Sequence, residues 1–211
     1  MIDADSYLAL DKVFTGNMTG NVLFIGFALV GVAGIPFFNN LIALLGFVTG
    51  TIIGGRIVGR GHTKGLPRVS AIVLIAGGLL GLIIATIWTV VGHLPQPILL
   101  VLTFLLANVM GSQVSAVKPI GNSDVTTIVV TNTLANLARD SRLAGGTKER
   151  WMPRLFAVLA MGIGAAIGAL VIRLTGGSVA LYCAMAFYAA GVVTLLLTAR
   201  HSHLQAPEDM T

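Results

Sequence analysis

Long apolar runs almost free of charge constrain the fold of this chain more than any other feature. A helix needs ~20 apolar residues to span a bilayer, and several runs reach that length once their polar flanks are counted. Only 10% of the 211 residues are charged, whereas soluble domains carry roughly a quarter. We therefore expect an all-α, polytopic transmembrane helical bundle of about six spans, forming a single integral membrane domain over 1–211. The runs cover 22–34, 41–57, 70–91, 98–110, 155–172 and 179–198.

Lysine and arginine residues gather in two connections between these runs. One extends from Arg56 to Arg68 and the other from Arg139 to Arg154, whereas the connections that begin at Gly31 and Val91 contain neither residue type. Basic connections of membrane proteins lie on the cytoplasmic side. We therefore expect both basic connections in the cytoplasm. The net charge of +5 then indicates topology, and we expect no nucleic-acid partner.

Two polar segments interrupt the apolar pattern. The first, VFTGNMTGN, runs from Val13 to Asn21, and the second, VTTIVVTNTLANLA, runs from Val125 to Ala138. The second segment is too short and too polar for a helix that faces lipid. We expect a broken or re-entrant half-helix there, and the sequence leaves open whether it spans the membrane or re-enters.

The two halves of the chain resemble each other. Leu41 to Gly54 aligns with Leu155 to Gly168 without a gap and with six identities, and the two polar segments precede these stretches in the same order. Matches in the same order favour an internal duplication. With the topology above, the matched spans run in opposite directions, which is typical of inverted repeats in transporters. We expect repeat one over about 1–92, repeat two over about 96–200, and a short tail over 201–211.

The polar segments are the candidate solute site. Polar backbone at membrane depth persists only where protein or a water-filled cavity surrounds it, and free N–H groups with hydroxyl and amide side chains can hold an anion or a polar solute. The alternative is that these residues only join helices. Nearby carboxylates, Asp3 and Asp124, are candidates for coupling. The predicted site comprises Thr15, Asn17, Thr19, Gly20, Asn21, Thr127, Thr131, Asn132 and Thr133.

Small residues recur at a spacing of four on two predicted helices. Gly46, Gly50 and Gly54 form one stripe, and Gly164 and Gly168 belong to its counterpart. Such stripes allow helix backbones to approach closely. We expect these glycines to pack helices, either within one chain or between two chains of a homodimer.

Several stretches resemble the YoaK family of bacterial inner-membrane proteins along essentially the whole chain. They are VFTGNMTGNVLFIGFAL, GFVTGTIIGGRI, MGSQVSAVKPIGNSDVTTIVVTNTLANLA and LAGGTKERWMPRL. The resemblance implies the bacterial inner membrane and leaves the molecular function unassigned. It also implies an apolar half-helix ahead of Asp3-Ala4, and the chain starts inside that motif. The second TGT-like element of the family reads Thr131-Asn132-Thr133 here.

The sequence favours transport over catalysis. No His, Cys or carboxylate residues have metal-ligand spacing inside the apolar runs, and no serine has a His or Asp arrangement typical of a nucleophile. We expect no enzyme, no metal site and no cofactor. The expected partners are the lipid bilayer and a small polar or anionic solute moved by alternating access of the two repeats. A non-transporting scaffold or regulator and a channel remain the alternatives.

Overall fold

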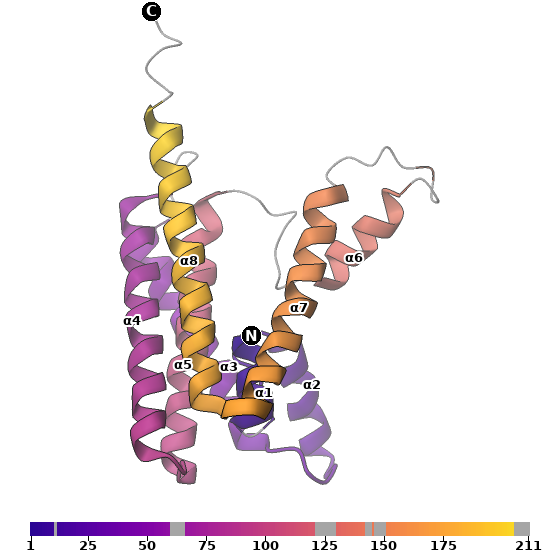
Figure 1. Ribbon diagram of the computed structural model, residues 1–211. Coiled ribbons are helices and arrows are strands. Elements are labelled where there is room, and N and C mark those ends of the chain that lie inside the picture. The colour runs from indigo at the N-terminus through magenta and orange to yellow at the C-terminus, as the bar shows by residue number, and fades with distance from the viewer. Residues whose placement is uncertain (11, 60–65, 121–129, 142–144, 146–150, 205–211) are drawn as a thin grey trace, which may run out of the picture.

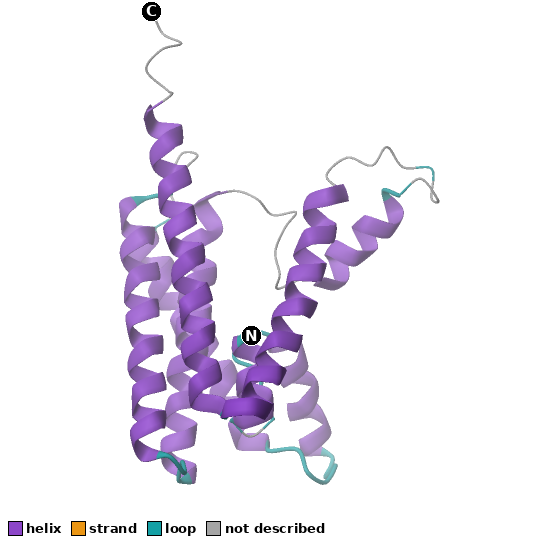
Figure 2. Ribbon diagram, viewed as in Figure 1, coloured by secondary structure: helices purple, strands orange, loops and turns teal. Residues whose placement is uncertain are grey.

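Helices make up the regular structure of the described residues, as a computed structural model of the chain shows (Figure 1). Figure 2 shows no strand among these residues, and the expected all-α class is confirmed. The structure describes residues 1–10, 12–59, 66–120, 130–141, 145 and 151–204. The helices are α1 (Ile2–Ala9), α2 (Met18–Leu29), α3 (Phe37–Val58), α4 (Arg68–Val91), α5 (Gln96–Val117), α6 (Val130–Arg139), α7 (Trp151–Thr175) and α8 (Gly177–Leu204), with a short 3-10 helix (Lys118–Ile120) after α5.

Five helices of the described part are long and apolar enough to cross a membrane: α3, α4, α5, α7 and α8. The first apolar run forms only the 12-residue helix α2. The helix ends at Leu29 and is followed by Gly31 and Gly34, which both have positive φ angles that other residues rarely adopt. The total of six spans therefore stays a prediction.

Prolines mark where three of the long helices begin. Pro36, Pro67 and Pro95 each occupy the position just before the first helical residue of α3, α4 and α5. Proline lacks the N–H group that would be unpaired at a helix start, and its fixed φ suits that position. These prolines therefore mark in the sequence where the three helices start.

The most extensive helix contact joins α3 and α5. A Cβ added at Gly46 would strike the carbonyl of Phe104, and one at Gly50 would strike the carbonyl of Asn108. At Gly54, an added Cβ would lie 3.0 Å from the Cα of Ser112. The two backbones therefore approach within a distance that only glycine permits. The predicted stripe lies at a contact within the chain.

A second set of small residues joins α4 to α8. Gly77 lies against the hydroxyl of Tyr188, Gly78 lies against its ring, and Gly81 lies against the side chain of Met185. The Tyr188 hydroxyl donates a hydrogen bond to the backbone oxygen of Leu74 at 2.9 Å. Because a peptide carbonyl of α4 accepts this bond, the two helices are held by packing and by a polar contact.

The short helix α1 packs against α7 and α8. A Cβ added at Gly168 would lie 3.3 Å from Ala4, and one at Gly177, where α8 begins, would lie 2.6 Å from Trp88 and 2.7 Å from Ala9. Figure 1 shows α1 beside the part of α7 that leads into α8. The start of the chain and its last two long helices therefore form one packed unit.

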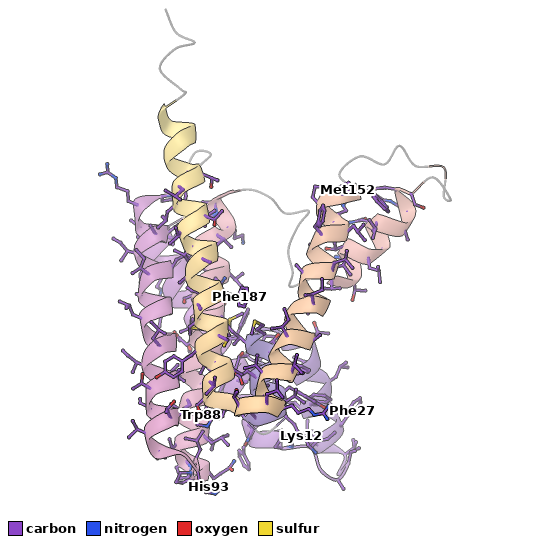
Figure 3. The ribbon with its side chains drawn as sticks, viewed as in Figure 1. Lys12, Phe27, Trp88, His93, Met152 and Phe187 are labelled. Atoms are coloured by element: carbon purple, nitrogen blue, oxygen red, sulfur yellow. The ribbon has the colours of Figure 1, made fainter. Side chains whose placement is uncertain are left out.

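The described residues that flank the two basic connections lie at the same end of the molecule, which is the upper end in Figure 1. Figure 1 shows α4 and α7 both beginning at this end, and α8 returning to it. Figure 3 places Met152, at the start of α7, at the end opposite His93, which joins α4 to α5. Because α4 starts where α3 finishes, α3 and α7 cross the bundle in opposite directions.

Substitution of Gly50 by alanine should destabilise the protein, because the added methyl group overlaps the backbone of α5. Overpacking a tightly packed contact costs about 1–3 kcal/mol. Thermal unfolding in detergent, followed by tryptophan fluorescence, measures the effect. Gly162→Ala in α7 is the matched control, since its added Cβ meets no atom within 4 Å. Equal melting temperatures for the two variants would contradict the close contact of α3 and α5.

Candidate functional site

The first polar segment begins as a loop between α1 and α2 and continues into the first turn of α2, and the loop is fastened to α1 by Asp3. Its Oδ1 atom accepts hydrogen bonds from the backbone N–H of Thr15 at 3.0 Å and of Gly16 at 2.7 Å. The Thr15 hydroxyl donates a third bond to the same oxygen at 3.3 Å. Hydrogen bonds to an ionised acceptor are stronger than bonds between neutral groups. Asp3 therefore satisfies peptide groups that no helix satisfies.

Asn21, in the first turn of α2, holds the same loop from the other side. Its Oδ1 atom accepts a bond from the Phe14 N–H at 3.0 Å, and its Nδ2 donates to the Phe14 carbonyl oxygen at 2.6 Å. Both backbone groups of Phe14 are thus paired with one fully buried side chain. The Phe14 ring stacks on Tyr7, with centroids 4.8 Å apart, and leaves room only for glycine at position 20, where a Cβ would lie 2.8 Å from it.

The polar groups of the first segment therefore have different surroundings. Thr15 and Asn21 are fully buried and are bonded to Asp3 and to Phe14, whereas Asn17 is half-buried and Thr19 is exposed. Asn21 uses both ends of its amide on Phe14. Thr19, by contrast, lies at the surface. The sequence predicted these residues as one lining, and the structure separates those that hold the loop from those at the surface.

The second polar segment is described from Val130 onward, as the ten-residue helix α6. Thr131 and Asn132 are exposed and Thr133 is buried, whereas Thr127 and Asp124 lie outside the described residues. Helix α6 packs against α7, and α2 packs against α3. Within the described part of the chain, the two polar segments thus have different partners and share no lining.

An ion pair fixes α6 to the start of α7. The carboxylate of Asp140 accepts a hydrogen bond from the guanidinium of Arg154, which is buried, and a second one from Arg139 at 3.3 Å. The hydrogen bond from Arg154 has the larger effect and the one from Arg139 the smaller, and together they hold the pKa of Asp140 below its ordinary value. The contact therefore keeps α6 on α7 at neutral pH, and it weakens as acid protonates the carboxylate.

A cavity of about 980 Å³ opens beside the ends of α3 and α5 that adjoin the basic connections. It contains two cationic side chains, Arg56 and Lys118, and neither forms an ion pair with another described residue. The hydroxyls of Thr51 and Ser115 lie on its wall. Ser115 donates to the Thr51 carbonyl at 2.8 Å, so the hydroxyl keeps lone pairs for a further partner. The wall therefore combines positive charge with polar groups.

The sequence analysis did not identify this cavity. Arg56 was assigned to topology alone, because a basic residue at the end of a span is ordinary. Lys118 and Ser115 are far from it in the sequence, and only the close contact of α3 with α5 brings them together. The spacing of four between Gly46, Gly50 and Gly54 was the signal of that contact, but it did not specify which helix would lie opposite.

Comparison with known proteins agrees with the resemblance seen in the sequence. A family model described as "Protein of unknown function (DUF1275)" matches residues 1–195. The chain is 33% identical over 140 residues to "UPF0700 transmembrane protein YoaK" of Bacillus subtilis (strain 168), and the match covers 66% of this chain and 61% of that relative. The expected relation to the YoaK family is confirmed. No solved structure matches.

Replacement of Asn21 by alanine should lower thermal stability and leave the basic cavity intact. The change removes both partners of the Phe14 backbone, and a buried polar group left unpaired costs about 1–3 kcal/mol. Asn132→Ala is the matched control, because Asn132 is exposed on the counterpart segment. The melting temperatures of the two variants are measured in detergent. A decrease no greater for Asn21→Ala than for Asn132→Ala would show that the hydrogen bonds between Asn21 and the Phe14 backbone do not stabilise the fold.

Proposed function

Because the chain belongs to the DUF1275 family, whose description assigns no function, we propose one from its geometry: transport of a small anionic or polar solute. In this proposal the protein moves the solute by alternating access of two inverted repeats, over about 1–92 and 96–200. Supporting this proposal are the pattern of helix contacts, the basic cavity and the multi-pass membrane character of the chain.

The pattern of helix contacts is the observation that carries the proposal. When α1 to α4 are matched in order with α5 to α8, each major contact has a counterpart. The contact of α3 with α5 corresponds to that of α7 with α1, α4 with α5 corresponds to α8 with α1, and α2 with α3 corresponds to α6 with α7. The contact of α4 with α8 is its own counterpart. This is the pattern expected of a pseudo-two-fold axis between α4 and α8.

The glycines give this correspondence a physical basis. Gly54 of α3 and Gly168 of α7 are matched in the sequence alignment, and each lies against the counterpart helix, α5 or α1. Small residues at both contacts let the backbones come close and leave little side-chain interlocking. Two similar packed units meeting at α4 and α8 can rock against each other, which is how many transporters with inverted repeats expose their site alternately.

The charge of the cavity favours an anion over a neutral solute. Two cationic side chains in one cavity repel each other, and a bound anion removes that repulsion. Arg56 offers a planar set of donors that matches carboxylate or phosphate oxygens, and Lys118 adds a point charge. By the positive-inside rule this end of the bundle faces the cytoplasm. We assign the structure to an inward-open arrangement in the bacterial inner membrane.

A non-transporting scaffold or regulator is the second candidate. It is favoured by the first polar segment, where Thr15 and Asn21 bond within the protein, as expected if the polar segments only hold the fold together. The exposed apolar residues along α7, including Phe156 and Ile163, suit either lipid or the second chain of a homodimer.

The topology has a direct test with introduced cysteines in a Cys183→Ala background. Leu66→Cys and Ser141→Cys fall in the basic connections, and His93→Cys falls in the opposite connection. A membrane-impermeant maleimide added to intact cells should label only His93→Cys, because charged reagents do not cross the bilayer. Labelling of Ser141→Cys without Leu66→Cys would overturn the inverted arrangement and favour parallel halves.

Small anions should raise the melting temperature of the purified protein if the cavity binds them. Inorganic phosphate, sulfate, nitrate and acetate are suitable probes, and a ligand at one hundred times its Kd stabilises by about 2.7 kcal/mol. Arg56→Gln and Lys118→Gln should abolish the shift. Arg173→Gln is the matched control, since Arg173 lies in the last turn of α7 and does not line the cavity.

Flux into proteoliposomes then separates transport from binding. An anion that stabilises the protein should exchange across the membrane in the wild type and not in Arg56→Gln. Binding without flux would favour the scaffold or regulator. A screen without any stabilising ligand, together with lower stability of Thr19→Val and Thr131→Val, would do the same.

A further inference from the structure

The carboxyl group of Asp5 is buried without a partner in the middle of α1. The residue is 1% exposed, and neither of its two carboxyl oxygens has a hydrogen-bond partner among the described residues. Asp3, two positions earlier, accepts three hydrogen bonds. The sequence analysis chose Asp3 as a coupling candidate, but the structure uses Asp3 to fasten the loop and leaves Asp5 unpaired.

No cation compensates Asp5 from the helices that pack on α1, which are α7 and α8. Burial raises the pKa of Asp5, and the positive charge of the Met1 amino group, on α1's own side, lowers it by less. Arg154 is paired with Asp140, and Arg173 is exposed. The hydroxyls of Tyr182 and Tyr188 bond to Thr86 and to the Leu74 carbonyl. The remaining titratable side chain in the membrane part of α8 is Cys183.

An ionised carboxylate in such a place is unfavourable. Removal of a charge from water without hydrogen bonds has a large free-energy cost, and a buried carboxyl group avoids it by holding its proton. The core cluster that adjoins α1 is apolar: it includes Leu10, Trp88 and Leu181, and Ile2 and Ala9 of α1 pack against it. The protonated acid is therefore the form compatible with the packed arrangement of α1, α7 and α8.

We propose that Asp5 is a proton-binding site, protonated in the packed state and ionised when α1 separates from α7 or α8. On separation the O–H bond of the acid breaks, its electron pair stays on the carboxylate, and the proton passes to water. Repacking reverses the step. The site thus takes a proton from water and makes the position of α1 depend on pH.

Proton binding at Asp5 stands on its own, whereas its coupling to a solute rests on the proposed function. In a transporter whose halves rock about α4 and α8, α1 would separate from α7 or α8. Asp5 would then be exposed to water on one side of the membrane. Each cycle then releases or takes up a proton. Solute movement would accordingly be linked to the proton gradient.

The first experiment measures thermal unfolding as a function of pH, with the wild type and Asp5→Asn tagged at the C-terminus. An aspartate in the unfolded chain has a pKa of ~3.9, whereas folded Asp5 holds its proton to higher pH. The stability from this proton is fully present below pH ~4 and is lost as the pH rises. One proton changes the unfolding equilibrium by about tenfold for each pH unit. The melting temperature of the wild type should therefore fall with rising pH relative to Asp5→Asn.

A second measurement does not depend on unfolding. The infrared spectrum of the folded wild type at neutral pH should contain the carbonyl band of a protonated carboxylic acid, and Asp5→Asn should lack it. Asp140→Asn is the matched control and should retain the band, because Asp140 is paired with Arg154 and ionised. Absence of the band from the wild type, or parallel pH profiles for wild type and Asp5→Asn, would overturn the proposal.

Two further measurements complete the test. The first distinguishes a proton from a sodium ion at Asp5, and the second distinguishes proton binding alone from proton binding coupled to solute movement. Exchange of sodium for choline should leave the wild-type melting temperature unchanged, and a sodium-dependent shift absent from Asp5→Asn would replace the proton site by a sodium site. Where an anion is transported, Asp5→Asn should lose pH-driven uptake and keep anion exchange. Unaltered pH-driven uptake would refute the coupling, and a protein without flux that still shows the pH profile would refute only the proposed transport.

Discussion

The close approach of α3 and α5 is the contact on which the rest of the structure depends. Apolar side chains give no hydrophobic driving force between helices within lipid, so association comes from van der Waals packing and polar contacts. Gly46, Gly50 and Gly54 bring α3 onto the backbone of α5, and Gly111 of α5 lies against the Phe47 carbonyl of α3. The helices α2 and α4 then pack on this pair. The same approach brings Arg56 and Lys118 into the lining of one cavity.

Much of the fold could be predicted from the sequence, because the bilayer imposes its own pattern. The charge-free runs located the five long helices, and the spacing of four located the glycine contacts. Gly168, matched with Gly54 through the repeat, lies against α1. The first apolar run differs from the others in the structure, and the sixth span stays a prediction. Its length resembles that of the others, but glycine residues with positive φ after Leu29 limit it to a short helix.

The site was harder to predict, since its chemistry depends on which residues meet in three dimensions. VFTGNMTGN identified a special loop, but not that Asn21 would bond both backbone groups of Phe14. The residues of the cavity come from the ends of α3 and α5 and from the residues that follow them. Most of them belong to two quoted stretches, GFVTGTIIGGRI and MGSQVSAVKPIGNSDVTTIVVTNTLANLA, and the sequence does not show that these stretches meet. Asp3 and Asp5 look equivalent in the sequence. Only the fold places one against free N–H groups and the other against apolar side chains.

These two carboxylates give α1 a double attachment of unequal kind. Asp3 ties the helix to the loop before α2 through backbone donors that stay in place whenever the loop is folded. Asp5 lies in the buried contact with α7 and α8, where its ionisation and tight packing are incompatible. A change at that contact would therefore leave α1 attached to the first half of the chain and alter its attachment to the second. The two residues lie two positions apart on a helix of eight residues, so a separation of α1 from α7 or α8 would change the surroundings of Asp5 and leave those of Asp3 in place.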